Sequence, residues 1–323
     1  MKQSTLAVAS GFEKYGRATR RAEFLAAMEV VVPWSDLVAL IEPHYPRAGN
    51  GRPPVGVERM LRIYFLQQWF NLSDPGVEDA LYDSLSMRGF VGIDLGREPV
   101  PDETTVCKFR HLLERHELGR PMLAQVNRYL DKHGLKIGTG TIVDATILGA
   151  PSSTKNRSVE RDPEMRSTRK NGQWHFGMKA HVGVDAGTKL IHSVEATAAN
   201  VHDSRVMGDL LHGQETEVWG DQAYQGQGKR LRERAPNAVD RTNQRCRSKL
   251  RVLEDVREEN RLKSKIRSRV EHVFGVMKLR FGFSRVRFRG LRKNLHRLLT
   301  TCALINLLTA RNHLLEVTGQ SRA

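Results

Sequence analysis

Cysteine is scarce in this sequence, and its placement excludes two kinds of cross-linked protein. The three cysteines, Cys107, Cys246 and Cys302, lie far apart and form no CxxC pair. That spacing favours neither a disulfide framework nor a zinc site, and it fits a protein of the reducing cytoplasm.

Long apolar runs are also missing. No run reaches the roughly 18–20 residues that a membrane-spanning helix needs, and the apolar stretch 301–310 is short and interrupted by Asn306. Residues 1–10 contain no long apolar core, so we expect no secretory signal peptide. These two absences argue against a membrane partner.

Acidic residues are outnumbered by basic ones. The chain has 52 Lys and Arg against 36 Asp and Glu, a formal net charge of +16 and a pI of about 10.1. Such an excess points to a polyanion, and with the membrane disfavoured we expect nucleic acid. At 323 residues, of which 39% are hydrophobic, the chain is long enough for a sizeable core and for two domains.

The first part of the chain, residues 1–134, has the pattern of a helical domain. Apolar residues recur at three- and four-residue spacing in the segments 23–28, 57–70 and 77–85. Asp102 is suited to cap a helix over 103–114, and Pro121 opens a further helix that Gly134 closes. Short helices of this kind are compatible with a helix-turn-helix DNA reader and equally with an ordinary bundle, and the basic balance favours DNA contact.

The second part, residues 135–323, changes to strands. An apolar run before Asp144 predicts one strand, the alternation over 174–185 predicts a half-buried strand, and 189–196 is its predicted hairpin partner. We expect the remaining elements as a helix over 203–211, a strand over 217–219, a helix over 229–234, a weak strand over 238–241 and a long helix through Glu271. The polar segment 151–172 is expected to be a loop that is either solvated or in contact with DNA.

This order of elements, three strands followed by alternating helices and strands, is that of an α/β protein with an RNase H-like core. A basic helical region would end the chain. Folds of this type carry carboxylates at the ends of their strands, and here Asp144 and Asp221 both close short apolar runs. Together with Glu271 they come from separate elements and could converge on a hard divalent cation such as Mg²⁺. In so basic a chain this suggests a metal-dependent enzyme acting on DNA phosphodiesters.

The helix around Glu271 carries two cations at helical spacing. At about 100° per residue, Arg267, Glu271 and Lys278 fall within roughly 40° of one another. One interpretation is an exposed charged face with weak ion pairs. The other is a metal-binding carboxylate flanked by two cations that hold phosphate oxygens.

The set of motifs resembles the DDE insertion-sequence transposases, and most closely their insertion sequence five (IS-five) group. The resemblance covers nearly the whole chain and rests on Asp144, Asp221 and Glu271 with Arg267 and Lys278 around the last. Further motifs of the group are Gly51–Pro54, Asn71–Asp74, Val143–Thr146, Ala150–Lys155, Gln173–His181 and Asp221–Gly226. One departure is Ser264, which stands where the wider signature has a tyrosine.

The resemblance implies a transposase that cuts the ends of its mobile element and joins them to target DNA. Asp144 would bridge two Mg²⁺ ions, for which Mn²⁺ could substitute, and Asp221 and Glu271 would each complete one ion. Arg267 and Lys278 would hold backbone phosphates of double-stranded DNA, with the chain acting as a homo-oligomer on that DNA. The alternatives are a DNA-binding protein of transposase descent without turnover, and an RNase H-like nuclease that does not join strands.

Two further groups of cations are candidate DNA contacts. Arg285, Arg287 and Arg289 alternate with apolar residues after the Glu271 helix, and such clustering favours phosphate contact over a solvated face. Lys179 lies on the polar face of the predicted strand 174–185, where a solvated face is an equal alternative. We expect a bacterial, cytoplasmic, nucleoid-associated protein.

Overall fold

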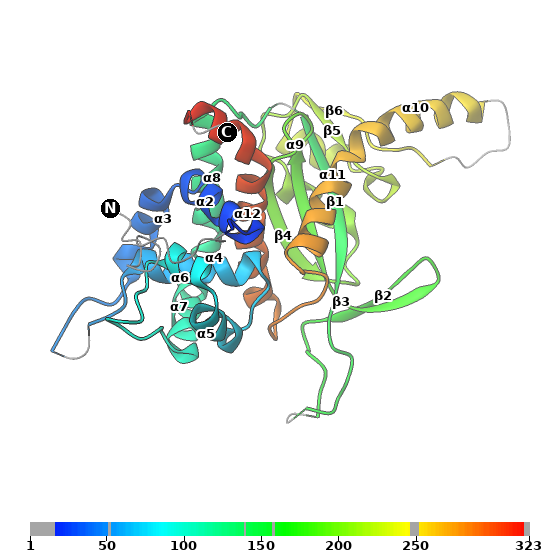
Figure 1. Ribbon diagram of the computed structural model, residues 1–323. Coiled ribbons are helices and arrows are strands. Elements are labelled where there is room, and N and C mark those ends of the chain that lie inside the picture. The colour runs from blue at the N-terminus through cyan, green and yellow to red at the C-terminus, as the bar shows by residue number, and fades with distance from the viewer. Residues whose placement is uncertain (1–16, 51–52, 139, 157–158, 246–251, 320–323) are drawn as a thin grey trace.

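The computed structural model of the chain describes residues 17–50, 53–138, 140–156, 159–245 and 252–319. It is a mixed α/β protein. Helices from the first part of the chain gather on one side of the molecule, and a sheet with its own helices lies on the other (Figure 1). Within the described residues no single helix is long and apolar enough to cross a membrane, although the bent pair Arg20–Val31 and Trp34–His44 passes the same test of length and composition.

The helical part contains seven α-helices in its described residues, where the sequence pattern predicted helices. They are α2 (Arg20–Val31), α3 (Trp34–Ile41), α4 (Val57–Trp69), α5 (Asp74–Asp83), α6 (Leu85–Val91), α7 (Glu103–Arg115) and α8 (Gly119–Lys132), with a 3₁₀ turn η1 at Glu42–His44. Asp102 caps α7 as predicted, accepting a hydrogen bond from the Thr105 amide at 2.7 Å. The predicted helix 77–85 ends early, because Ser84 caps a separate helix, α6.

The second part forms a six-stranded sheet. The strands are β1 (Gly140–Gly149), β2 (Arg166–Lys170), β3 (Gln173–Asp185), β4 (Ile191–Ala198), β5 (Glu217–Trp219) and β6 (Val239–Asp240). They are ordered β2-β3-β1-β5-β6, and β4 pairs with β3 as well. β1 is antiparallel to β3, whereas β5 is parallel to β1 and β6 is parallel to β5. The predicted order of strands is therefore confirmed, with β2 as an addition.

Three local predictions were wrong. The segment 151–172 is not all loop, because Arg166–Lys170 pairs with β3 as β2. The predicted helix 203–211 is two short 3₁₀ turns, η2 (Asp203–Arg205) and η3 (Met207–Leu210). Strand β3 is not half-buried: from Gly177 onward nearly every side chain is buried, because the strand is covered on both faces.

The helix through Glu271 is also not continuous. It consists of α10 (Val252–Arg267) and α11 (Arg269–Gly275), and it runs into a π-helical segment, Val276–Arg280. In that segment the Phe281 amide bonds the carbonyl five residues back, at Val276. A constant 100° per residue therefore does not hold from Arg267 to Lys278.

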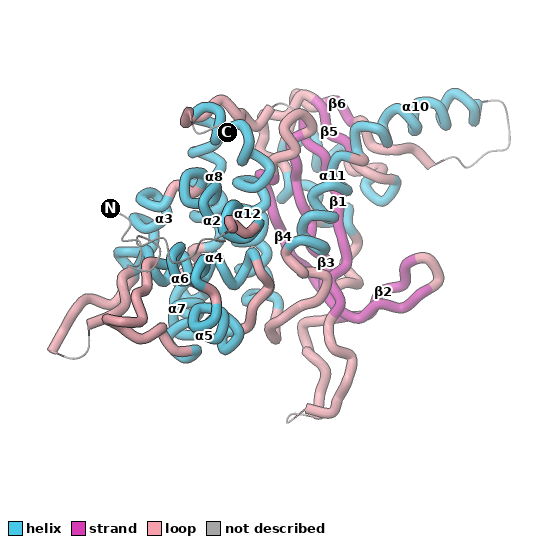
Figure 2. Tube along the Cα trace, viewed as in Figure 1, coloured by secondary structure: helices cyan, strands magenta, loops and turns pink. Residues whose placement is uncertain are grey.

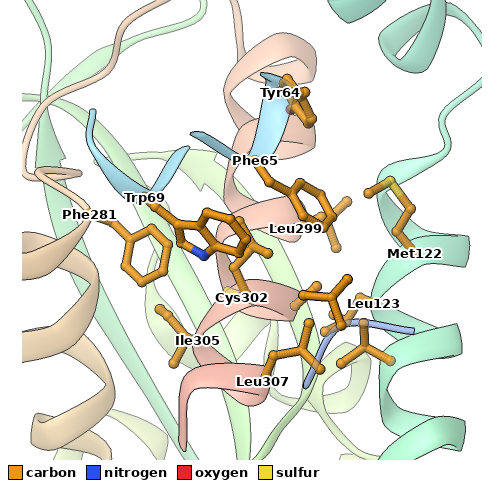
Figure 3. Packing of buried hydrophobic residues seen from close by; sticks show 14 of the residues in the cluster. Tyr64, Phe65, Trp69, Met122, Leu123, Phe281, Leu299, Cys302, Ile305 and Leu307 are labelled. Atoms are coloured by element: carbon orange, nitrogen blue, oxygen red, sulfur yellow. The ribbon is translucent and has the colours of Figure 1, made fainter. Parts of the chain in front are cut away.

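The last helix, α12 (Leu291–Val317), joins the two parts of the molecule. It packs against α8 and α2 of the helical part and against β4 of the sheet. Figure 3 shows Cys302, Ile305 and Leu307 of this helix among side chains of α4 and α8. A single buried apolar cluster runs from the helical part through α12 to one face of the sheet, and a smaller one under the other face contains Val143, Val218 and Tyr224. The division at residue 134 stays a prediction, but the two sides share one core.

Asn306 explains why the apolar run of α12 is interrupted. It is fully buried, and its side-chain oxygen accepts a hydrogen bond from the Ile191 amide at 2.9 Å. Its side-chain nitrogen donates to the Ile191 carbonyl and to Asn127, both at 2.7 Å. The residue thus satisfies the backbone where β4 begins and fixes that strand to α12 and α8.

We predict that Asn306→Ala lowers the free energy of unfolding by about 1–3 kcal/mol, because it leaves the buried Ile191 amide without its acceptor. Urea denaturation followed by circular dichroism measures this. The control is Thr309→Ala, whose hydroxyl bonds the Ile305 carbonyl of its own helix. Equal, small losses in both variants would contradict the structural role of Asn306.

Candidate functional site

Asp144 projects from the face of β1 that α11 covers. Side chains alternate along a strand, so Asp144 shares a face with Ile142 and Leu148, which belong to the large core, and not with Val143 beneath the sheet. α11 packs on β1 through buried residues that include Val270 and Val273. Asp144 therefore sits at the edge of an apolar interface, with 9% of its surface exposed.

Asp221 reaches the same region from the neighbouring strand. The parallel pairing of β1 with β5 places Ile142 beside Trp219, so two residues further along, Asp144 and Asp221 occupy adjacent positions. Asp221 follows the end of β5 and opens the 3₁₀ turn Gln222–Tyr224 by accepting a hydrogen bond from the Ala223 amide at 2.8 Å. Strand register thus brings together two carboxylates that are distant in the sequence.

Glu271 and Arg267 approach from above the sheet. Glu271 lies in the first turn of α11 and is exposed, while Arg267 is the last residue of α10. The Arg267 guanidinium donates a hydrogen bond from Nη1 to Oδ2 of Asp144 at 2.9 Å. The two side chains lie on either side of the helix break at Ser268, and both line the same cavity as Asp144.

The three carboxylates line one cavity of about 570 Å³. Its wall also contains the two predicted cations, Arg267 and Lys278, so the structure brings together all five residues of the proposed signature. The remaining lining residues are Ala145, Thr146, Lys170, Phe274, Gly275 and Leu279. Lys278 reaches this cavity although the helix is broken, because the π-helical segment continues from the end of α11.

Burial and crowded negative charge raise the pKa of Asp144. Loss of solvent is the main cause, and the charges of Asp221 and Glu271 add to it. The hydrogen bond from the Ala145 amide, at 2.7 Å, and the charge of Arg267 act in the opposite direction. The net effect brings the pKa to about 6. Burial of Asp144 therefore costs more than the hydrogen bond of Ala145 and the charge of Arg267 offset.

The chemistry of the donors suits a hard divalent cation, because all three are carboxylate oxygens and their repulsion is what such an ion relieves. Their arrangement differs from a formed metal centre. In the described ranges no group of three or more His, Cys, Asp or Glu side chains could hold a metal ion as positioned. At Asp144 the neighbouring positive charge is the guanidinium of Arg267.

The three arginines after the π-helical segment have different surroundings. Arg287 donates to the Leu72 carbonyl at 2.6 Å and to the Asn71 carbonyl and side chain at 2.9 and 2.6 Å. It thereby ties the C-terminal part to the Asn71–Asp74 motif, a contact that the sequence did not predict. Arg285 is exposed beside the end of β1, where its backbone forms an isolated parallel β-bridge with Gly149. A DNA contact at Arg285, Arg287 or Arg289 stays a prediction.

Lys179 does not line the cavity. It pairs across the strands with Ile147, on the face opposite Asp144, and its ammonium bonds Asp203 and the Val201 carbonyl, both at 2.8 Å. His181, two residues on, is fully buried, and this burial lowers its pKa to about 4. Lys179 and His181 thus face Asp203 in a packed group under the sheet, so the solvated strand face considered for Lys179 is wrong. DNA contact by Lys179 stays an untested prediction.

Sequence reasoning missed Lys170 and Leu279. Lys170 lies in the segment expected to be a loop, although the Asn171-Gly172 pair followed by the alternating strand is a hairpin signal that could have located it. Leu279 follows Lys278 directly in the sequence, and it is 88% exposed at the cavity wall. The π-helical turn that exposes it has no signal in the sequence that we recognise.

The fold and the site together define a class: an α/β enzyme in which one aspartate on a strand, one just after the neighbouring strand and one glutamate on a helix line a cavity together with cations. Residues 136–307, more than half of the chain, match the family described as "Transposase DDE domain". The chain belongs to this family and is a DDE-type transposase. Residues 13–112 match a second family, "Transposase domain (DUF772)". The resemblance drawn from the motifs is thus confirmed at the level of DDE transposases.

One solved structure is similar over most of the chain. It is the piggyBac transposase, described as a cryo-EM structure of a synaptic complex with hairpin DNA. The sequences are 12% identical, the TM-score is 0.49, and the match covers 92% of this chain and 74% of that chain.

The raised pKa of Asp144 gives a prediction about stability. Because the folded-state pKa of about 6 lies above that of an unfolded aspartate, near 3.9, the folded protein loses stability as pH rises through this window. With divalent cations chelated, Asp144→Asn should therefore raise the free energy of unfolding by about 1–3 kcal/mol at pH 8 and change it little at pH 4.

Urea denaturation at the two pH values measures this difference. Asp131→Asn, at an exposed position of α8, is the control. Destabilisation of the Asp144 variant at pH 8 would mean that its ion pair with Arg267 outweighs the cost of burying the carboxylate.

Proposed function

We propose that the chain cuts double-stranded DNA at the ends of a mobile element and joins the freed 3′ ends to target DNA. The observation that carries this proposal is the convergence of Asp144, Asp221 and Glu271, from three elements, on one cavity lined by cations. We further propose that the sheet belongs to the RNase H-like type. The antiparallel strands β1, β3 and β4, followed by the parallel strands β5 and β6, support this assignment, and β2 is an addition on β3.

The three carboxylates would hold divalent metal, with Mg²⁺ as the ion we propose and Mn²⁺ as a substitute. The donor set supports this because it consists of hard oxygens, and a cation would stabilise the charged form of the buried Asp144, which the ion pair with Arg267 does only in part. Bound metal would supply activation of the attacking hydroxyl and stabilisation of the charge that develops on the phosphate. For the carboxylates to share ions, Asp144 must release Arg267 and the three groups must come closer together.

The residues of the chain itself then have separate tasks. Asp144 and Asp221 are fixed by the strand register, so they define where the scissile phosphate lies. Glu271 is on a helix beside a break, which allows it to adjust its distance to the other two. Lys278 can neutralise nonbridging phosphate oxygens, and so can Arg267 once it is released from Asp144. The cavity is partly enclosed, and the attraction between opposite charges is stronger there than in water.

The test uses Asp144→Asn, Asp221→Asn and Glu271→Gln, each of which keeps side-chain size and removes the charge. We expect each variant to lose Mg²⁺-dependent cleavage of element-end DNA by at least ~10³-fold while still shifting that DNA in a gel. Lys132→Gln, at the exposed end of α8, serves as a matched charge control. Wild-type cleavage by any one triad variant would remove that residue from the site.

A strand-joining assay separates this proposal from a nuclease. Element-end duplex already cut to expose its 3′-OH is incubated with supercoiled target DNA and Mg²⁺. Joined products support a transposase, whereas target nicking without joining indicates an RNase H-like nuclease. Binding without either product indicates a transposase-derived binding protein.

We also propose membership of the IS-five group, on the motifs that run from Gly51–Pro54 to Asp221–Gly226. The matching inverted repeats expected in DNA flanking the gene supply the end substrate for these assays. Sedimentation of the chain with and without end duplex tests the proposed homo-oligomer on DNA.

A further inference from the structure

Lys170 is held at the triad cavity by a hairpin that the sequence did not reveal. β2 and the start of β3 extend beyond the body of the sheet (Figure 2). The chain turns at Asn171 and Gly172, which have φ values of 51° and 80°, and Lys170 pairs with Gln173 directly across that turn. Two-residue turns with positive φ match the twist of the strands they join. The position of Lys170 is therefore fixed by strand pairing.

The base of this hairpin is closely fitted to β1. A Cβ added at Gly177, where β2 pairing ends, would lie 2.1 Å from the Leu148 carbonyl oxygen. The adjacent Ala150 amide also bonds the Phe176 carbonyl at 2.8 Å. This tight junction ties the hairpin to the strand that bears Asp144, so that Lys170 and the triad are parts of one framework.

Three cations line the cavity: Lys170, Arg267 and Lys278. Arg267 bonds Asp144, whereas in the described part of the chain neither lysine ammonium forms an ion pair or hydrogen bond with another residue. Lys278 has its pKa lowered by burial first and by the charge of Lys170 second, and Glu271 opposes this. The two lysines are thus close enough to repel each other, and an anionic oxygen between them would offset that repulsion.

We infer that Lys170 and Lys278 form a subsite for one backbone phosphate next to the scissile bond, and that the β2–β3 hairpin serves to carry Lys170 to it. This inference rests on the proposed function, because the ligand is the DNA strand of that reaction. An ammonium acts as a point charge with three donors and suits a phosphate whose angle of approach varies. The exposed Leu279 on the same wall offers apolar surface to the sugar next to that phosphate.

The first arm of the test compares neighbouring cations on one strand. Successive side chains of a strand project to opposite sides, so Arg169→Gln is a matched control for Lys170→Gln. Both substitutions remove one positive charge from the same hairpin, but the two side chains project in different directions. Single-turnover cleavage of element-end duplex in Mg²⁺ should fall roughly tenfold in Lys170→Gln, stay within about twofold of wild type in Arg169→Gln, and recover largely in Lys170→Arg.

The second arm identifies the phosphate. Single methylphosphonates, which remove one backbone charge each, are placed along the strand around the cleavage point. At the subsite phosphate the neutral link should weaken binding and cleavage by wild type but add no further loss in Lys170→Gln, because the contact is already gone. At every other phosphate the two losses should multiply.

Equal losses in Lys170→Gln and Arg169→Gln, or multiplying losses at every phosphate, would overturn the subsite. This comparison of wild type and Lys170→Gln on native and methylphosphonate DNA is made for DNA binding without metal as well as for cleavage. If the wild-type chain binds end DNA without cutting it, the proposed function is refuted. The binding measurements on the same DNA still decide whether the subsite exists. Thermal unfolding of each variant verifies that the hairpin substitutions leave the fold intact.

Discussion

The packing of α11 on the Asp144 face of β1 is the constraint on which the site depends. Val270, Val273 and Phe274 bury the apolar side of this helix in the large core. That burial fixes the height and direction of Glu271 above the sheet, and it also removes water from Asp144. The same contact therefore sets both the geometry of the triad and its electrostatics.

This arrangement stores unfavourable energy at the site. A carboxylate in a mostly buried position with two other carboxylates nearby opposes folding at neutral pH, and one guanidinium offsets only part of the cost. A stabilised fold would have an apolar or amide side chain there. The chain instead keeps the charge, which is what a site that acts on phosphate through divalent cations requires.

Contacts elsewhere in the molecule fix the elements around this site. α12 passes between the helical part and the sheet, and Asn306 fixes the start of β4 by bonding both backbone groups of Ile191. Arg287 joins the segment after the π-helix to Asn71 and Leu72 of the helical part. With one core running through both parts, the helical part keeps a defined position relative to the triad.

The sequence by itself determined which five residues were expected to share one site, and they line one cavity in the structure. It also determined most of the elements that bear them. Asp144, Asp221 and Glu271 could be recognised because apolar runs end at the first two and because the motifs recur in a fixed order. Local signals such as the Asp102 cap and the alternation of β3 depend on neighbouring residues alone, so they could be identified without the fold.

Tertiary structure decided what depends on partners distant in the chain. Three features each need a second segment that sequence spacing does not specify. They are the burial of both faces of β3, the ion pair between Lys179 and Asp203, and the hydrogen bonds of Arg287 to Asn71 and Leu72. Arg267, Glu271 and Lys278 share one cavity, as their spacing predicted, although the helix is interrupted at Ser268 and continues as a π-helical turn. Lys170 joins them only because β2 pairs with β3.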